Sequence, residues 1–380
     1  MKNQITISGS YLATVIISVL LIFIGNKLTV RDMEVFLGAR QEVVKAKVQR
    51  IIERVKPGVE FDEFLPLRDD KIIFEAKITG GIRKNERITA VQNFGGLTSV
   101  SPKEVKAGDS VLLINTGDEW YFNTFLRMNK ILALGIFFTL CVLFFGGRKG
   151  FNTILSLGLT CAAIFAVFIP SIFSGKNIYV MSLLICVYTI IMTLLIVIGF
   201  NKKALTAVIG CASGVLVTGI ITLIMDKVLL LTGIVDEHSL YLSNLPFETK
   251  INLRAIIFAG IIIGAMGAVM DVAMSISSSL WEVKEKAGKI NFETLFRSGL
   301  TIGRDIMGTM ANTLILAYIG CSLSVVLLLS VYSGSLLSLF NSEMIIVEIL
   351  QALAGSLGIL FAMPLTAFFS SILYLKNKNG

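Results

Sequence analysis

The chain has 380 residues, of which 54% are hydrophobic and only 16% are charged. This composition excludes an ordinary water-soluble domain and predicts a protein with several membrane-spanning helices. The net charge of +8 does not indicate nucleic acid as a partner, because the basic residues neither cluster in a patch nor alternate with exposed aromatic side chains.

The first apolar run covers residues 8–25, follows Lys2 and ends without an A-x-A cleavage pattern. We interpret residues 1–27 as a retained N-terminal membrane anchor, with a cleaved signal peptide as the alternative.

Residues 28–128 are polar and predict a separate domain. Four stretches alternate between polar and apolar residues as strands do: E-V-V-K-A-K-V-Q-R-I-I, K-I-I-F-E-A-K-I-T, E-R-I-T-A-V-Q-N-F and D-S-V-L-L-I-N-T. Turn signals separate them at Gly80-Gly81, Gly95-Gly96 and Ala107-Gly108-Asp109. We expect a small all-β barrel of the oligonucleotide/oligosaccharide-binding (OB) or SH3-like type, since closing the sheet removes exposed edges. Such barrels bind ligands in some proteins and brace assemblies in others, so the fold does not decide the function.

Residues 129–380 predict a seven-helix transmembrane domain. Each apolar run is long enough for a hydrocarbon core of about 30 Å, and together they cover residues 131–146, 153–173, 178–200, 204–225, 255–280, 306–330 and 344–374. With the anchor, eight transmembrane helices are expected. The connector 226–250 predicts a short amphipathic element at the surface, and residues 290–300 predict an interfacial helix before the chain re-enters the bilayer.

The connectors predict the orientation. If the eight helices alternate, most basic residues fall on one side: Lys2, Arg148, Lys149, Lys202, Lys203, Lys284, Lys286, Lys289, Arg297, Lys376 and Lys378. The opposite short connectors hold only Lys176, Lys227, Lys250 and Arg254. The positive-inside rule makes the first side cytoplasmic. Both termini are then cytoplasmic and residues 28–128 are extracytoplasmic.

Residues 260–320 are predicted to form a polar core. At about 100° per residue, one face of the first helix in this stretch carries three glycines, two carboxylates and two hydroxyls: Gly260, Gly264, Gly267, Asp271, Ser275, Ser278 and Glu282. The glycines predict close helix packing. An Asp in such a helix costs about 2.5–3.5 kcal/mol to insert and is a candidate functional residue.

We hypothesise that Asp271 binds and releases H⁺ or Na⁺, with help from the hydroxyls of Ser275 and Ser278. The structural alternative is a hydrogen-bonded or ion-paired Asp that only fastens helices. Glu282 lies three turns further along, and a solvated carboxylate at the helix end is the simpler interpretation of it.

The next helix brings a second polar set. One of its faces holds Asp305, Thr309 and Asn312, and another holds Arg304, Gly308 and Ala311. Arg304 either extends to the membrane interface or pairs with Asp271 or Glu282. We expect these residues to share an ion- or proton-coupling site with Asp271 where the sixth and seventh helices meet, with Gly308 in the packing contact.

Metal and cofactor chemistry is not expected. The five cysteines lie in apolar runs without disulfide or zinc spacing, and the only histidine, His238, lies in a connector. The sequence contains no phosphate-binding loop, dinucleotide fingerprint or hydrolase signature, so we do not expect an enzyme.

Two segments carry a family resemblance: G-A-M-G-A-V-M-D-V-A-M-S-I-S-S-S-L-W-E and S-G-L-T-I-G-R-D-I-M-G-T-M-A-N-T-L-I-L-A-Y-I-G. They resemble the YibE/F family of bacterial multi-pass membrane proteins, which implies a location in the bacterial cytoplasmic membrane but no biochemical activity. The arrangement is also similar to half of a resistance-nodulation-division permease or of the SecD/SecF translocation proteins, whose membrane carboxylates couple proton movement. This chain departs from them by two extra helices and a single such half.

Two hypotheses of different classes follow. The first is an ion-coupled transporter or permease-like protein with a carboxylate site between the sixth and seventh helices. The alternative is a non-transporting scaffold or assembly partner whose β domain docks another envelope protein. Expected partners are the lipid bilayer, H⁺ or Na⁺, and an envelope protein or further copies of the chain.

Overall fold

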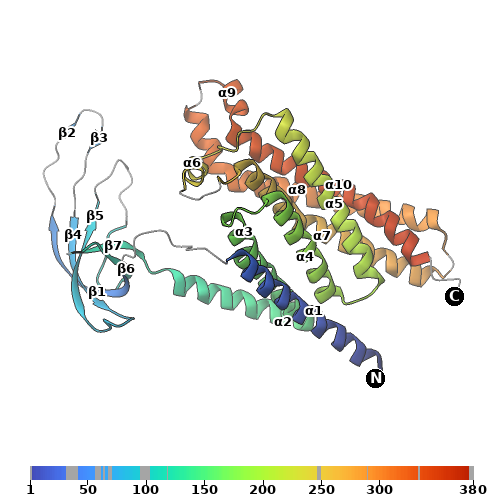
Figure 1. Cartoon of the computed structure of the whole chain (residues 1–380), viewed down its shortest axis with the longest axis horizontal. Coiled ribbons are helices and arrows are strands. Elements are labelled where there is room, and N and C mark those ends of the chain that lie inside the picture. The colour runs from blue at the N-terminus through green and yellow to red at the C-terminus, as the bar shows by residue number, and fades with distance from the viewer. Residues whose placement is uncertain are drawn as a thin grey trace. The chain divides into compact units, whose positions relative to one another are not determined.

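The computed structural model describes residues 2–30, 42–55, 61–62, 65–66, 71–94, 103–117, 119–245, 250–288, 290–332 and 334–375. Contacts divide the chain into two compact units, Glu34–Cys141 and the combination of Met1–Met33 with Val142–Gly380 (Figure 1). The predicted turn at Gly95-Gly96 lies outside the described residues, as do Lys289, Lys376, Lys378 and the side chain of Lys2.

The smaller unit contains a closed barrel of five strands. They are neighbours in the order β1 (Glu42–Val55), β4 (Lys71–Ile78), β5 (Arg87–Asn93), β7 (Trp120–Phe125) and β6 (Ser110–Asn115). Adjacent strands are antiparallel except β5 and β7, which are parallel. Two short strands, β2 (Phe61–Asp62) and β3 (Leu65–Pro66), pair separately. The expected small β-barrel is confirmed, while its assignment to the OB or SH3-like type stays a prediction.

Strict alternation explains the barrel core. Along β4, the side chains of Ile72, Phe74, Ala76 and Ile78 are buried while their neighbours are more exposed. Strand β1 pairs with β4 on one side and β6 on the other, and register shifts near Val48 and Ile51 bend it. Such irregularities increase the local twist and let one strand close a barrel. The sequence analysis missed β7, because its residues do not alternate cleanly between buried and exposed.

The larger unit is helical. Helix α2 (Met128–Ala163) belongs to this unit from Val142 onward. The other helices are α1 (Lys2–Thr29), the π-helix η1 (Ile164–Phe168), α3 (Ile169–Phe173), α4 (Ile178–Ile198), α5 (Lys202–Val228), α6 (Glu237–Ser243), α7 (Leu253–Ala287), α8 (Phe292–Tyr332), α9 (Leu336–Asn341) and α10 (Glu343–Leu375). Among the described residues, seven helices are long and apolar enough to cross a membrane. The short α6, closed by an Asp236–Ser239 capping box, occupies the connector where an amphipathic element was expected.

Helix α2 contains two of the predicted transmembrane segments. Its backbone is non-helical at Gly147, where φ is +52°, a conformation that glycine adopts without the steric cost of a side chain. The carbonyl of Val142 lies directly against Gly150, so the chain turns back sharply at this point. Residues 128–146 and 148–163 are therefore two helical segments, and the total of eight spans stays a prediction.

The centre of the larger unit is the packing of α5 on α10. Small residues bring the two backbones together: a Cβ added at Gly214 would lie 2.7 Å from Ala362 Cβ, and one at Gly358 would overlap the hydroxyl of Thr218. Helix α7 covers this pair with a continuous apolar face that includes Val269, Ile276 and Leu280. Close backbone approach through small residues is the usual basis of helix association in lipid.

The prediction of a separate interfacial helix at residues 290–300 is wrong, because these residues begin a longer helix. Helix α8 runs without a break from Phe292 to Tyr332, through the predicted boundary before residue 306. Its first turns are held by the bundle, since Leu295 is fully buried and the rings of Phe292 and Phe296 contact Phe368 of α10. The amphipathic pattern therefore reflects packing against α10.

Basic residues gather at one end of the helical unit. Lys203 and Lys284 both lie over the ring of Trp281, and Lys202 Nζ donates to the carbonyl of Leu373 at 3.4 Å. These contacts bring the start of α5 together with the ends of α7 and α10. Arg254 lies at the opposite end, 3.9 Å from Asp226.

Candidate functional site

Helix α7 has two opposite faces. The apolar face is buried against α5, α8 and α10, whereas the predicted polar face is uncovered. Gly260, Gly264, Gly267, Asp271 and Glu282 are exposed, and Ser275 and Ser278 are half-buried. The segregation follows from the sequence, because a face of glycines and short polar side chains offers less apolar surface to bury than one of Ile, Val and Leu.

Three contacts fix the register between α7 and α8. A Cβ at Gly299 would lie 2.9 Å from Leu280, Gly303 faces Ile276, and a Cβ at Gly264 would lie 2.7 Å from the hydroxyl of Tyr318. The residue numbers rise along α8 as they fall along α7, so the helices are antiparallel neighbours. This register places Asp271 level with Gly308 and Thr309.

The polar residues of α8 are also uncovered. Arg304, Asp305, Gly308, Thr309 and Asn312 are all exposed, while the opposite side of the helix packs through Gly299 and Gly303. The Thr309 hydroxyl donates to the carbonyl of Ile306 at 2.9 Å and so is satisfied within its own helix. Both helices thus present short polar side chains at the same level.

The predicted side chains do not contact one another. Among the described residues, no ion pair or side-chain hydrogen bond involves Asp271, Glu282, Arg304 or Asp305, so the alternative in which Arg304 pairs with Asp271 or Glu282 is not present. Space is open around Gly260, Gly267 and Gly308, whose added Cβ atoms would meet nothing within 4 Å. Their role in helix packing stays a prediction. It requires another helix, from a second copy of the chain or from a partner protein, against this face.

Asp271 lies near the middle of its helix. At about 1.5 Å per residue it is roughly 24 Å or more from either end of Leu253–Ala287. Among the described residues no basic side chain pairs with this carboxylate, so it must take up a proton, bind a cation or be hydrated. This is the chemistry that the uncovered face supports.

A buried hydroxyl cluster was missed by the sequence analysis. The hydroxyl of Ser277 lies 2.7 Å from that of Thr206, 2.7 Å from that of Tyr374 and 2.7 Å from the carbonyl oxygen of Lys203. The Tyr374 hydroxyl also lies 2.8 Å from that of Thr206. The cluster joins α5, α7 and α10. Ser277 and the half-buried Ser278 differ by one position, which is about 100° around the helix, and no pattern in the sequence distinguishes them.

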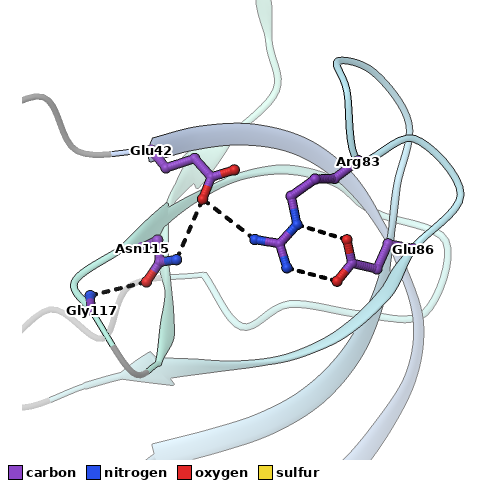
Figure 2. Close-up of polar contacts among 5 residues, drawn as sticks. All are labelled: Glu42, Arg83, Glu86, Asn115 and Gly117. Atoms are coloured by element: carbon purple, nitrogen blue, oxygen red, sulfur yellow. Dashed lines mark hydrogen bonds and ion pairs between the residues drawn. The ribbon is translucent and has the colours of Figure 1, made fainter.

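A second candidate site lies at one end of the barrel. Figure 2 shows the Arg83 guanidinium between two carboxylates: it donates twice to Glu86 at 2.7 Å and lies 3.4 Å from Glu42. Asn115 accepts a hydrogen bond from the backbone of Gly117 and extends its amide toward Glu42. The hydrogen bond from Arg83 holds the pKa of the Glu86 carboxyl below its usual value.

This polar network borders a cleft of about 450 Å³. Strand β1 contributes Glu42, Val43, Val44 and Lys45 to its lining, and the turn after β4 contributes residues 80–83. Ile82 is fully exposed there and Val43 is half exposed. The cleft therefore combines charged side chains with uncovered apolar ones, as protein-docking surfaces do.

Within the described ranges, no three His, Cys, Asp or Glu side chains come together as metal ligands. A family model described as YibE/F-like protein matches residues 134–376 of the chain. Neither a curated protein nor a solved structure matches it.

Proposed function

We propose, from the premise that the chain belongs to the family of YibE/F-like proteins, that it is an ion-coupled, permease-like protein in which Asp271 binds the coupling H⁺ or Na⁺. The family and the seven apolar helices support a multi-pass membrane protein. The main support for coupling is the position of Asp271, which is uncovered near the middle of α7 without an ionic partner among the described residues.

The physical basis is the cost of an unpaired charge inside the bilayer. With H⁺ or Na⁺ bound, the carboxylate is neutralised and its face can lie against apolar surroundings. Without the ion, the face requires water or a polar partner. Ser275 and Ser278 supply hydroxyl oxygens on the same face, and Thr309 lies level with the carboxylate on α8. Binding and release would thus favour different surroundings for one helix face, which is the requirement for coupling.

The test is Asp271→Asn in proteoliposomes containing the full chain. Proton flux is followed with an internal pH dye and sodium flux with ²²Na⁺. We expect ion flux at least tenfold lower than in the parent protein, because asparagine has no charge to exchange. Glu293→Gln is the control, since that exposed carboxylate pairs with Arg297 at the start of α8 and should leave the flux unchanged.

Equal ion flux in the parent protein and Asp271→Asn would remove Asp271 from the mechanism. A cysteine accessibility scan along residues 260–282 and 301–320, in a protein without the native cysteines, shows whether water or protein lies over this face. Labelling by a water-soluble maleimide indicates a hydrated path and favours transport. Protection throughout indicates a dry seam, with a second copy of the chain or another protein over the face.

We propose further that both termini are cytoplasmic and that the barrel lies outside the cytoplasm. Support comes from the gathering of Lys202, Lys203 and Lys284 at one end of the helical unit, as the positive-inside rule requires. A cysteine replacing the fully exposed Ile82 should react with a membrane-impermeant maleimide in intact cells. Reaction only after lysis would reverse the orientation.

The second candidate function is docking of an envelope protein by the barrel. It is favoured by the cleft of about 450 Å³ and by the uncovered Ile82 and Val43 beside Arg83. A photo-reactive residue at position 82 should cross-link one defined partner, whereas the same residue at position 52 should not. Ile52 is the matched control because it is exposed and apolar but lies at the other end of β1. Equal cross-linking from both positions would speak against a docking cleft.

A further inference from the structure

A large pocket lies at the end of the helical unit, away from the polar face of α7. Its volume is about 650 Å³, and three elements line it. Helix α1 contributes Tyr11 and Thr14, and the first turn of α2 after the Gly147 break contributes Arg148 and Asn152. The last residues of α4, together with Gly199 and Phe200 that follow it, complete the lining. The proposed function uses none of these residues.

The charge of this pocket is positive and uncompensated. Arg148 is exposed, and its side chain makes no ion pair or hydrogen bond to any part of the chain that the structure describes. The sequence contains no acidic residue between Glu119 and Asp226 or before Asp32. The pocket walls from α1, α2 and α4 therefore supply no carboxylate. An anion that pairs with Arg148 comes from outside these three helices.

The carbonyl groups at the end of α4 do not take that role. Ile196 O accepts from Asn152 Nδ2 at 3.0 Å, Leu195 O from the Gly199 backbone at 3.0 Å, and Ile198 O from Asn201 Nδ2 at 3.1 Å. Arg148 donates to none of these carbonyls, so its exposed guanidinium is open to an anion from outside the described chain. Tyr11 also lines the pocket, but its hydroxyl is buried and has no hydrogen-bond partner among the described residues.

The surroundings of the pocket are those of a lipid headgroup. Phe151 and Phe200 line it and are 55% and 81% exposed, and Phe144 and Phe145 just before the break are still more exposed. Aromatic rings at the end of apolar helices are typical of the membrane interface. Lys202, two residues beyond Phe200, belongs to the basic end of the unit, where anionic headgroups are attracted.

We propose that this pocket binds the phosphate headgroup of an anionic phospholipid, with Arg148 as its counter-charge. Its acyl chains lie along the exposed phenylalanines. The lipid holds α1 against α2 and α4 at this end, beside a small apolar cluster that includes Val15, Leu159 and Ile196. A free phosphate would satisfy Arg148 but would leave the phenylalanines without a partner.

The test titrates phosphatidylglycerol into the full-length protein in phosphatidylcholine nanodiscs and counts bound anionic lipid by native mass spectrometry. Arg148→Gln should weaken the tightest bound lipid about tenfold, the effect of one charge-assisted hydrogen bond. Tyr11→Phe should change the binding little, because the Tyr11 hydroxyl is buried. Lys149→Gln is the matched control, because it removes the same charge from the next residue, which does not line the pocket.

Equal losses in Arg148→Gln and Lys149→Gln would overturn the proposal, because binding would then follow surface charge alone. Inorganic phosphate, added to nanodiscs that already hold bound phosphatidylglycerol, distinguishes the two sources of the headgroup. If it displaces the lipid at micromolar concentration, the site takes a free anion and the proposal fails. Thermal unfolding in phosphatidylcholine alone should be the same for all three variants and the parent, which shows that the pocket variants fold.

Discussion

Gly210→Leu is expected to break the packing of α5 on α10 and to destabilise the helical unit by about 3 kcal/mol or more, the upper range for overpacking. A Cβ at this position would already lie 2.7 Å from Thr366 Cβ and overlap its hydroxyl. Both helices belong to the buried core, so neither can move aside without opening the contacts of α7. Thermal unfolding measures the loss through the reactivity of the buried Cys186 and Cys211 toward a thiol dye, in a background without the other three cysteines.

Gly158→Leu is the control for this substitution. Gly158 is also a helical glycine of the same unit, but nothing lies within 4 Å of an added Cβ. The side chain should therefore enter free space and change the unfolding temperature little. A similar loss in both variants would show that the penalty comes from glycine replacement in general and not from the contact between α5 and α10.

Ser277→Ala is expected to destabilise the same unit by about 1–2 kcal/mol. The substitution leaves the hydroxyls of Thr206 and Tyr374 and the carbonyl of Lys203 short of a partner that now lies 2.7 Å from each of them. These groups are buried, so water does not replace the lost contact. The thiol-dye measurement used for Gly210→Leu also reports this change.

Ser275→Ala provides the matched comparison. It removes the same hydroxyl two residues earlier on the same helix, from a half-buried position without a side-chain hydrogen bond among the described residues. We expect almost no change in the unfolding temperature. If Ser275→Ala costs as much as Ser277→Ala, the buried cluster does not account for the stability of the junction between α5, α7 and α10.

The sequence was sufficient for features that depend on local pattern. Apolar runs predicted the positions of the long helices, and alternation predicted four of the five barrel strands. Asp271 was singled out because a carboxylate in an apolar helix is unusual wherever it points. Its uncovered position and its level relative to Thr309 came only from the structure.

Features that depend on tertiary neighbours were not predictable. Gly260 and Gly264 have the same spacing as Gly210 and Gly214, and both pairs lie in apolar helices. Only the second pair packs in full against a neighbouring helix, because α10 presents Ala362 and Gly358 to it. In the same way, the pattern of Phe292 and Phe296 fits lipid or protein equally well, and Phe368 on a distant helix decides between them.

The absence of acidic residues between Glu119 and Asp226 has a consequence for how the protein responds to its surroundings. The ionisable side chains of residues 142–225 are lysine, arginine, tyrosine and cysteine only, types whose ordinary pKa values lie above about 8. From Val142 onward, the first carboxylate of the unit is Asp226, and His238 follows it. The side chains of this part of the unit that gain a proton on mild acidification are therefore expected in the later helices, from Asp226 on, and not in residues 142–225.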